Sequence, residues 1–193
     1  MMRIVGTLLL PALLPIACLP QTPNLPATAP ASVALRDAQL PRQVKNDIVA
    51  DIARGFETIP GEPDGRTIAL SSWTSRIRLS PEGPAAVEVD GGPDDYANGA
   101  TGNGDIWIFR IVGNRASLVF KGGGYSFRVL PKTIHNGLRD VETAWNTSCC
   151  DGGIEVYRFD GVRYRPAYCY SYQNDPDTDR MTYGKHERCS DSN

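Results

Sequence analysis

Between residues 67 and 170 the chain consists of short segments in which apolar and polar residues alternate, and Gly, Pro, Asn or Asp separates nearly all of them. Successive side chains of a β-strand point to opposite faces of the sheet. The two-residue alternation in these segments therefore predicts a β-sheet. Strands joined by short turns pair antiparallel. The expected strands are 67–70, 76–79, 85–89, 105–111, 117–120, 125–130, 140–145, 154–159 and 162–170.

One helix is expected before these strands. Apolar residues recur every three or four positions from Val44 to Phe56, which is the spacing of one helix face. Pro41 suits the first turn of this helix, and Gly55 suits its end. The expected fold class is therefore α+β, with one N-terminal helix packed on a mostly antiparallel β assembly.

The β region contains an internal similarity. Residues 83–89 resemble residues 137–143, and residues 106–110 resemble residues 154–158. We therefore expect two degenerate repeats, at about residues 79–120 and 130–170. One such unit cannot cover its own apolar face, so the two units must pack together or share a sheet.

The segment YRFDGVRY, residues 157–164, is similar to the hairpin of the FG-GAP type of β-propeller repeat. The chain also resembles small exported bacterial proteins and lipoproteins. Over residues 79–170 the resemblance implies a repeated strand pattern. Calcium-binding repeats of that family have an acidic loop before the strand, whereas residues 80–84 and 133–137 lack those carboxylates. The resemblance therefore implies no calcium ligands here, and a complete propeller needs more blades than this chain can supply.

The N-terminus predicts export. In residues 1–18 one positive charge, Arg3, precedes an apolar stretch that is too short and too rich in proline to span a membrane. Cys18 follows a small residue, as the modified cysteine of a bacterial lipoprotein does, and is a candidate lipid anchor. The alternative is cleavage after residues 32–34, which would discard Cys18. Residues 19–40 are rich in Pro, Thr and Ala and are expected to form an extended tether to one domain, residues 41–193.

The other four cysteines lie in the last quarter of the chain. In an exported protein they favour disulfides over a zinc site, whose ligands usually occur in closely spaced pairs. Adjacent cysteines rarely bond each other, so Cys149 and Cys150 are expected to pair with Cys169 and Cys189, in either order. The tail, residues 171–193, has almost no aliphatic residues, so a bridge to Cys189 is expected to hold it in place.

A glycine-rich stretch contains a candidate metal site. Its carboxylates are Asp90, Asp94, Asp95 and Asp105. Oxygen ligands on a flexible backbone suit Ca²⁺, although the spacing does not match an EF-hand. The alternative is a solvated hairpin loop.

The net charge and the absence of known motifs argue against several classes of function. The net charge is −2 and no Lys/Arg stripe is present, which argues against a nucleic-acid partner, and a lipid on Cys18 would be the only membrane contact. No Gly-x-Ser-x-Gly motif and no cofactor motif occurs. The evenly spaced Tyr164, Tyr168, Tyr170 and Tyr172 would share one strand face, as sheet core or as a binding surface.

These observations predict an exported protein of the periplasm or outer envelope that acts as a non-enzymatic binding or accessory module, inhibitor-like in size. Its partner would be a protein or a glycan. Two alternatives remain. One is a calcium-stabilised β module. The other is a secreted hydrolase that uses loop residues, namely Asp94, Asp95, His135 and Asp140.

Overall fold

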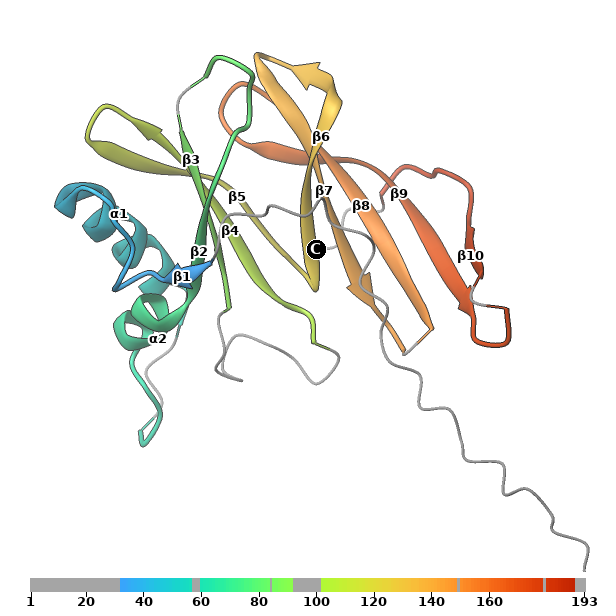
Figure 1. The fold of residues 1–193 in the computed structure, drawn as a ribbon, viewed down its shortest axis with the longest axis horizontal. Coiled ribbons are helices and arrows are strands. Elements are labelled where there is room, and N and C mark those ends of the chain that lie inside the picture. Colours follow the sequence, from blue (N-terminus) through green and yellow to red (C-terminus); the bar gives the residue numbers. More distant parts are fainter. Residues whose placement is uncertain are drawn as a thin grey trace, which may run out of the picture.

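The computed structural model describes residues 32–56, 60–83, 85–91, 102–148, 150–178 and 180–189. Within these residues the chain forms two antiparallel five-stranded sheets and two helices (Figure 1). The first sheet has the order β1 (Val33–Ala34), β2 (Trp73–Ile77), β3 (Ala86–Asp90), β4 (Gly104–Val112) and β5 (Arg115–Gly124). The second has the order β10 (Arg180–Tyr183), β9 (Tyr164–Asp175), β8 (Asp151–Phe159), β7 (Leu138–Asn146) and β6 (Ser126–His135). The expectation of an antiparallel β assembly within an α+β fold is confirmed.

Helix α1 (Arg42–Ala53) covers one face of the first sheet. Val44, Ile48 and Ile52 are buried on the side that contacts the sheet, as their spacing predicts. The carboxylate of Asp47 accepts hydrogen bonds from Arg115 Nε at 2.8 Å and from the amide of Ala116 at 3.0 Å, which fastens the helix to β5. These bonds lower the pKa of Asp47 to about 2.

A second helix, α2 (Gly65–Ser71), replaces the strand expected at 67–70, so that prediction is wrong. The Asp64 carboxylate accepts a hydrogen bond from the amide of Thr67 at 2.7 Å, and this N-cap starts the helix. Ile68 and Ala69 are the buried residues of this short helix, and they lie on the same side of it. A four-residue apolar run cannot distinguish a strand from a buried helix.

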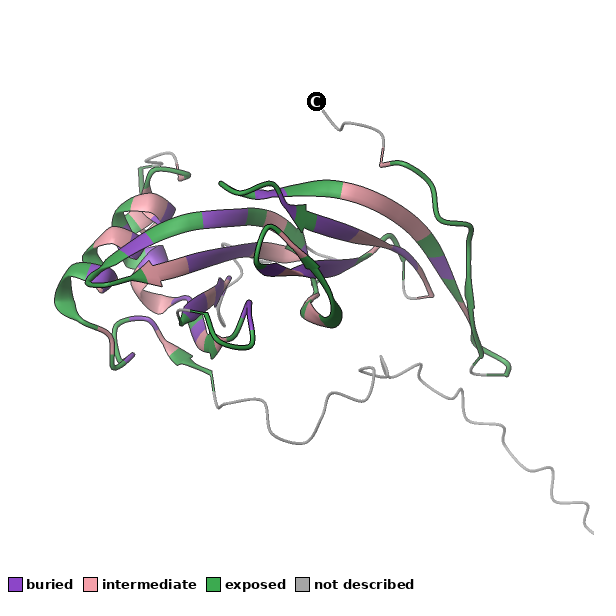
Figure 2. Ribbon diagram, turned by 90° about the horizontal axis from the view of Figure 1, so that it is seen from above, coloured by how far each residue is buried: buried purple, intermediate pink, exposed green. Residues whose placement is uncertain are grey.

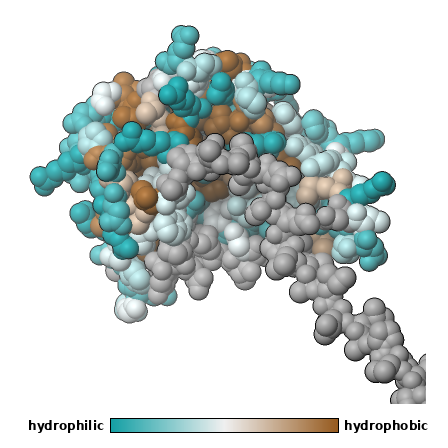
Figure 3. Space-filling model, viewed as in Figure 1, coloured by the Kyte–Doolittle hydropathy of each residue, from teal (hydrophilic) through white to brown (hydrophobic). Residues whose placement is uncertain are grey.

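The two apolar cores lie on opposite faces of the first sheet. Trp107 and Phe109 of β4 pack under α1, whereas Ile106 and Ile108 of the same strand pack against Val141 and other residues of the second sheet. In Figure 2 the buried residues are concentrated in α1 and in the region where the sheets overlap, while β10 and the segment after it are exposed. In Figure 3, apolar residues gather near the centre of the view, where the sheets adjoin, and hydrophilic side chains surround them.

The chain passes from the first sheet to the second at Gly124 and Tyr125. The Tyr125 amide donates a hydrogen bond to the carbonyl of Ala144 at 2.8 Å. Gly124 has φ 157°, and a Cβ at this position would lie 2.4 Å from the Ala144 carbonyl oxygen. A glycine is therefore required where the end of β5 crosses β7.

Strands with similar sequences occupy similar places in the two sheets. The similar segments 83–89 and 137–143 lead into or form β3 and β7, and segments 106–110 and 154–158 lie in β4 and β8. In each sheet, four strands that are consecutive in the sequence are also neighbours in space: β2-β3-β4-β5 in the first sheet and β6-β7-β8-β9 in the second.

Candidate functional site

One face of the second sheet points away from the first sheet, and we call it the outer face. Val141 of β7 and Tyr157 of β8 point into the core between the sheets. Because side chains alternate along a strand, Glu142 and Arg158 lie on the opposite side. Polar and aromatic residues gather on this outer face from β6, β7, β8, β9, β10 and the segment after β10. They are Arg128, His135, Asp140, Glu142, Arg158, Tyr168, Tyr170, Tyr183 and His186.

His135 and Asp140, two of the residues predicted from sequence, lie side by side at one end of this face. His135 Nδ1 is 2.6 Å from Asp140 Oδ1, and Arg158 Nε is 3.7 Å from the other carboxylate oxygen of Asp140. The Asp140 side chain is 2% exposed and the His135 side chain is 40% exposed. A carboxylate this deeply buried needs partners, and these two groups supply them.

A tight turn produces the contact between His135 and Asp140. Asn136 and Gly137 both have positive φ angles, 48° and 81°, which suit a two-residue hairpin turn. The Asn136 side-chain amide donates a hydrogen bond to the carbonyl of Phe159 at 2.8 Å, which attaches the turn to β8. The turn therefore returns β7 alongside β6 and presents an oriented imidazole on the outer face.

The aromatic side chains of the outer face form one continuous row. The Arg158 guanidinium lies 5.9 Å from the ring centroid of Tyr168. The His186 ring lies 4.9 Å from that of Tyr168 and 4.7 Å from that of Tyr170, and Tyr183 makes an edge contact with Tyr170 at 5.9 Å. We call Tyr168, His186, Tyr170 and Tyr183 the aromatic row. Arg158 joins it to the His135–Asp140 pair, so both histidines of the chain belong to one cluster.

A second buried carboxylate lies beneath the aromatic row. Glu142 Oε1 is 2.6 Å from Arg128 Nη2, and the Glu142 side chain is 11% exposed. Burial raises the pKa of Tyr170, and the negative charge of Glu142 raises it further. The tyrosine therefore keeps its proton and remains a hydrogen-bond donor at neutral pH.

Only part of the predicted tyrosine face exists. Tyr168 and Tyr170 lie on the outer face, and the register places Tyr172 on the same side, where it is buried with its hydroxyl bonded to Asn146. Tyr164 instead is packed in the core beside Phe159. A bulge in β9 causes this difference, because Val156 pairs with Tyr168 whereas the next residue of β8 pairs with Pro166. The extra residue reverses the facing of side chains across the bulge, so Tyr164 leaves the face that the other three share.

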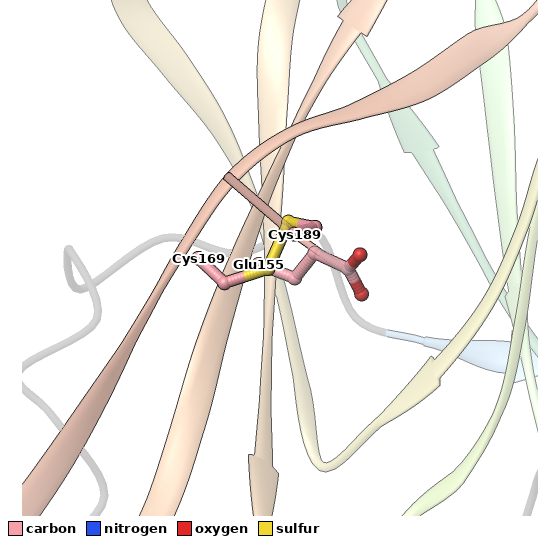
Figure 4. A group of neighbouring side chains, drawn as sticks. All are labelled: Glu155, Cys169 and Cys189. Carbon is pink, nitrogen blue, oxygen red and sulfur yellow. A yellow bond between two sulfur atoms is a disulfide. The ribbon is translucent and has the colours of Figure 1, made fainter. Parts of the chain in front are cut away.

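The disulfide joins Cys169 to Cys189, with their Cα atoms 5.2 Å apart (Figure 4). The prediction that each would pair with Cys149 or Cys150 is therefore wrong, whereas the bridge to Cys189 that holds the tail is confirmed. After β10 the chain turns back along β9, and Cys169 and Glu187 exchange two backbone hydrogen bonds of 2.9 Å. This return brings the two sulfurs together. Cys149 lies outside the described residues, and Cys150 lies just before β8.

Glu155 lies beside this disulfide. One carboxylate oxygen and both sulfurs lie within 4.8 Å of one another, but sulfurs that are bonded together do not act as thiolate ligands. The hydroxyl of Tyr157 donates a hydrogen bond of 2.5 Å to Glu155. Burial and this bond raise the pKa of Tyr157 above its usual range.

A groove on the inner face of the second sheet was not anticipated. It has a volume of about 430 Å³ and lies between Trp145 and the disulfide. Its other lining residues include Glu155, Ser171 and Lys185. The sequence signal that could have located it is Gly152-Gly153, since glycine inside a strand marks a close approach of another group.

The predicted calcium site is described only in part. Asp94 and Asp95 lie outside the described residues. Asp90 pairs with Ile106, which faces the second sheet, so Asp105, one residue before Ile106, is on the opposite face of the first sheet. The first and last of the four predicted ligands therefore point away from each other, and Ca²⁺ binding by this stretch stays a prediction.

Cys18 and the predicted signal also lie outside the described residues. None of the helices in the described ranges is long and apolar enough to cross a membrane. In comparisons with protein-family models, with curated proteins and with solved structures, no match to this chain was found.

Proposed function

We propose that this chain is an exported cell-envelope protein that acts as a non-enzymatic binding module, and that the outer face of the second sheet is its recognition surface. The observation that carries the proposal is the cluster of aromatic, histidine and arginine side chains above two buried carboxylates. Burying charged groups costs free energy unless they are paired. An ordered polar surface of this kind is therefore better explained by recognition than by folding.

The relation between the two sheets supports this choice of face. We infer that the sheets descend from two degenerate repeats, in which Ala86 corresponds to Asp140 and Ile106 to Ile154. In the first sheet, Ala86, Ile106 and Ile108 contact the second sheet. The corresponding face of the second sheet is the outer face, where no further sheet packs among the described residues. The outer face is thus the position at which a next unit would pack, and we propose that a partner protein occupies it.

Capture from cell-envelope extract tests this proposal. The full mature chain is immobilised, and bound proteins are compared for the wild type, for Tyr168→Ala and for Arg158→Ala. We expect both variants to lose the captured protein, since aromatic and arginine side chains dominate binding energies. Arg163→Ala, in the exposed turn before β9, is the matched control and should retain it. Equal capture by Tyr168→Ala would show that the partner binds elsewhere.

A secreted hydrolase is the second candidate, because the 2.6 Å contact between His135 and Asp140 is the arrangement that orients a general base. Hydrolysis of 4-nitrophenyl esters, glycosides and phosphates by the purified chain would support it if His135→Ala and Asp140→Asn both abolished the activity. Activity that survives both substitutions, or no activity in the wild type, would favour the binding module.

Export and anchoring are tested separately. The proposal places the protein in the periplasm or outer envelope, and the Cys169–Cys189 bridge is consistent with an oxidising compartment. If Cys18 carries a lipid, Cys18→Ser should move the protein from the membrane fraction to the soluble fraction. Unchanged partitioning would indicate cleavage beyond Cys18.

A further inference from the structure

The groove on the inner face of the second sheet is a separate site from the outer face. It lies toward β9, which with β10 is farthest from the first sheet in Figure 1. Its volume of about 430 Å³ is in the range of small-molecule sites. Its lining residues include Trp145, Glu155, Ser171, Lys185, Glu187 and Arg188, together with the disulfide.

Trp145 forms a flat wall of this groove. It pairs with Gly153 across the strands, and a Cβ on Gly153 would lie 2.3 Å from Cζ2 of the indole. The ring therefore rests directly on the backbone of β8, where only glycine leaves room. The residue is nevertheless 38% exposed. A large aromatic ring that is supported by backbone and still open to solvent is a stacking surface for a ligand.

The walls of the groove are held in place. The carbonyl of Trp145 accepts a hydrogen bond of 3.4 Å from Tyr172. The side chain of Asn103 bonds both the amide and the carbonyl of Asn146, at 2.9 and 2.8 Å. The Cys169–Cys189 bridge fixes the opposite wall. A site held in this way loses little conformational entropy when it binds a ligand.

The charges of the groove are balanced. Glu155 and Glu187 carry two negative charges, and Lys185 and Arg188 carry two positive charges. A charged ligand would therefore gain little from the groove as a whole. Separate acceptors and donors around an aromatic ring suit a ligand that has an apolar face and many hydroxyl groups, which are the properties of a pyranose sugar.

We propose that this groove binds a neutral saccharide, with a sugar ring stacked on Trp145 and its hydroxyl groups bonded to the charged side chains around it. Glu155 is the best acceptor for hydrogen bonds from these hydroxyl groups, because its carboxylate is already positioned by Tyr157. This site adds a second ligand class to the proposed protein-binding surface and does not depend on that surface.

The test uses the full mature chain and three neutral probes, cellohexaose, maltohexaose and the hexamer of N-acetylglucosamine, with polygalacturonate as an acidic comparison. Binding is measured by isothermal titration calorimetry and by the shift in tryptophan emission. We expect at least one neutral probe to bind with a Kd between micromolar and millimolar and Trp145→Ala to weaken it by about tenfold or more, equivalent to about 1.4 kcal/mol.

Matched variants separate binding from folding. Trp73→Ala removes a tryptophan of similar exposure from the first sheet and should leave binding unchanged. Trp145→Phe keeps an aromatic face and should restore part of the affinity that Trp145→Ala loses. Tyr168→Ala, on the outer face, should bind the probe as the wild type does. Absence of binding by all neutral probes, preference for polygalacturonate, or equal affinity in Trp145→Ala would overturn the proposal.

Discussion

The first and second sheets have similar strand orders but differ in what covers their outward surfaces. In the first sheet, α1 packs over Trp107 and Phe109, and the result is an apolar core. In the second sheet, the outward surface carries Asp140, Arg158 and the aromatic row, with no helix over it among the described elements. The contrast shows that similar strand orders can carry either an apolar core or an uncovered polar and aromatic surface, depending on whether helices pack over the sheet.

The largest expected effect comes from the covered sheet. Phe109 is fully buried under α1, and Phe109→Ala should lower the free energy of unfolding by about 3–5 kcal/mol, because it leaves a cavity. Urea denaturation measures the change. On the second sheet, Tyr168→Ala should cost less than about 1 kcal/mol, since this residue is only partly buried. Equal losses for the two variants would mean that the outer face is part of the folding core.

The disulfide should have the next largest effect, and it acts on the second sheet alone. The bridge closes a loop with a sequence separation of 20, so Cys169→Ser should cost about 2–4 kcal/mol. Amide hydrogen exchange should show the greatest loss of protection at Cys169 and Glu187, which exchange backbone hydrogen bonds. The amides of α1 should keep their relative order of protection. If α1 opens first instead, the two sheets are not independent in stability.

A smaller, pH-dependent effect distinguishes two glutamates at corresponding positions, Glu88 in the first sheet and Glu142 in the second. Glu142 has Arg128 as a partner, whereas burial raises the pKa of Glu88 to about 7, against a bond from Ser75 that lowers it. The folded chain therefore binds this proton more tightly than the unfolded chain. Stability should fall as pH rises from about 4.5 to about 7, by at most about 3 kcal/mol.

Glu88→Gln tests this sign. The variant should be more stable than the wild type at pH 8 and of similar stability at pH 4, as measured by thermal or urea unfolding. Glu82→Gln, at an exposed position, is the control and should leave the pH profile unchanged. A Glu88→Gln profile parallel to that of the wild type would show that Glu88 is ionised without cost in the folded state.

Local pattern was a good guide wherever local interactions decide the structure. The helix near Val44 and the strands around Val87, Ile108 and Val156 were predicted because period and turn residues act within a few positions. Helix α2 was missed because its Asp64 cap outweighed a short apolar run. The His135–Asp140 contact was anticipated only as two nearby polar residues, since the sequence does not state on which side of a strand a hairpin side chain will point.

The residues that form the groove could not have been assembled from sequence. Trp145 and Gly153 meet because β7 and β8 pair in one register, and Cys189 reaches Cys169 because the chain reverses after β10. A bulge of one residue in β9 separated Tyr164 from the other tyrosines with which even spacing had grouped it. Register, bulges and chain reversals depend on contacts between distant segments, and they leave no periodic signal in the sequence.

By itself, the sequence determined the class of structure, a mostly antiparallel β protein of the α+β class, since hydrophobic period and turn residues are properties of the chain. It did not determine the order of the first elements, because strand β1 precedes helix α1 and a second helix, α2, follows it. Tertiary structure decided which faces are covered, which cysteines bond and which polar side chains meet. The physical reason is that burial and pairing each involve two segments of the chain. Whether a given Glu, Tyr or Cys becomes core, crosslink or binding surface therefore depends on the neighbours that the fold brings to it.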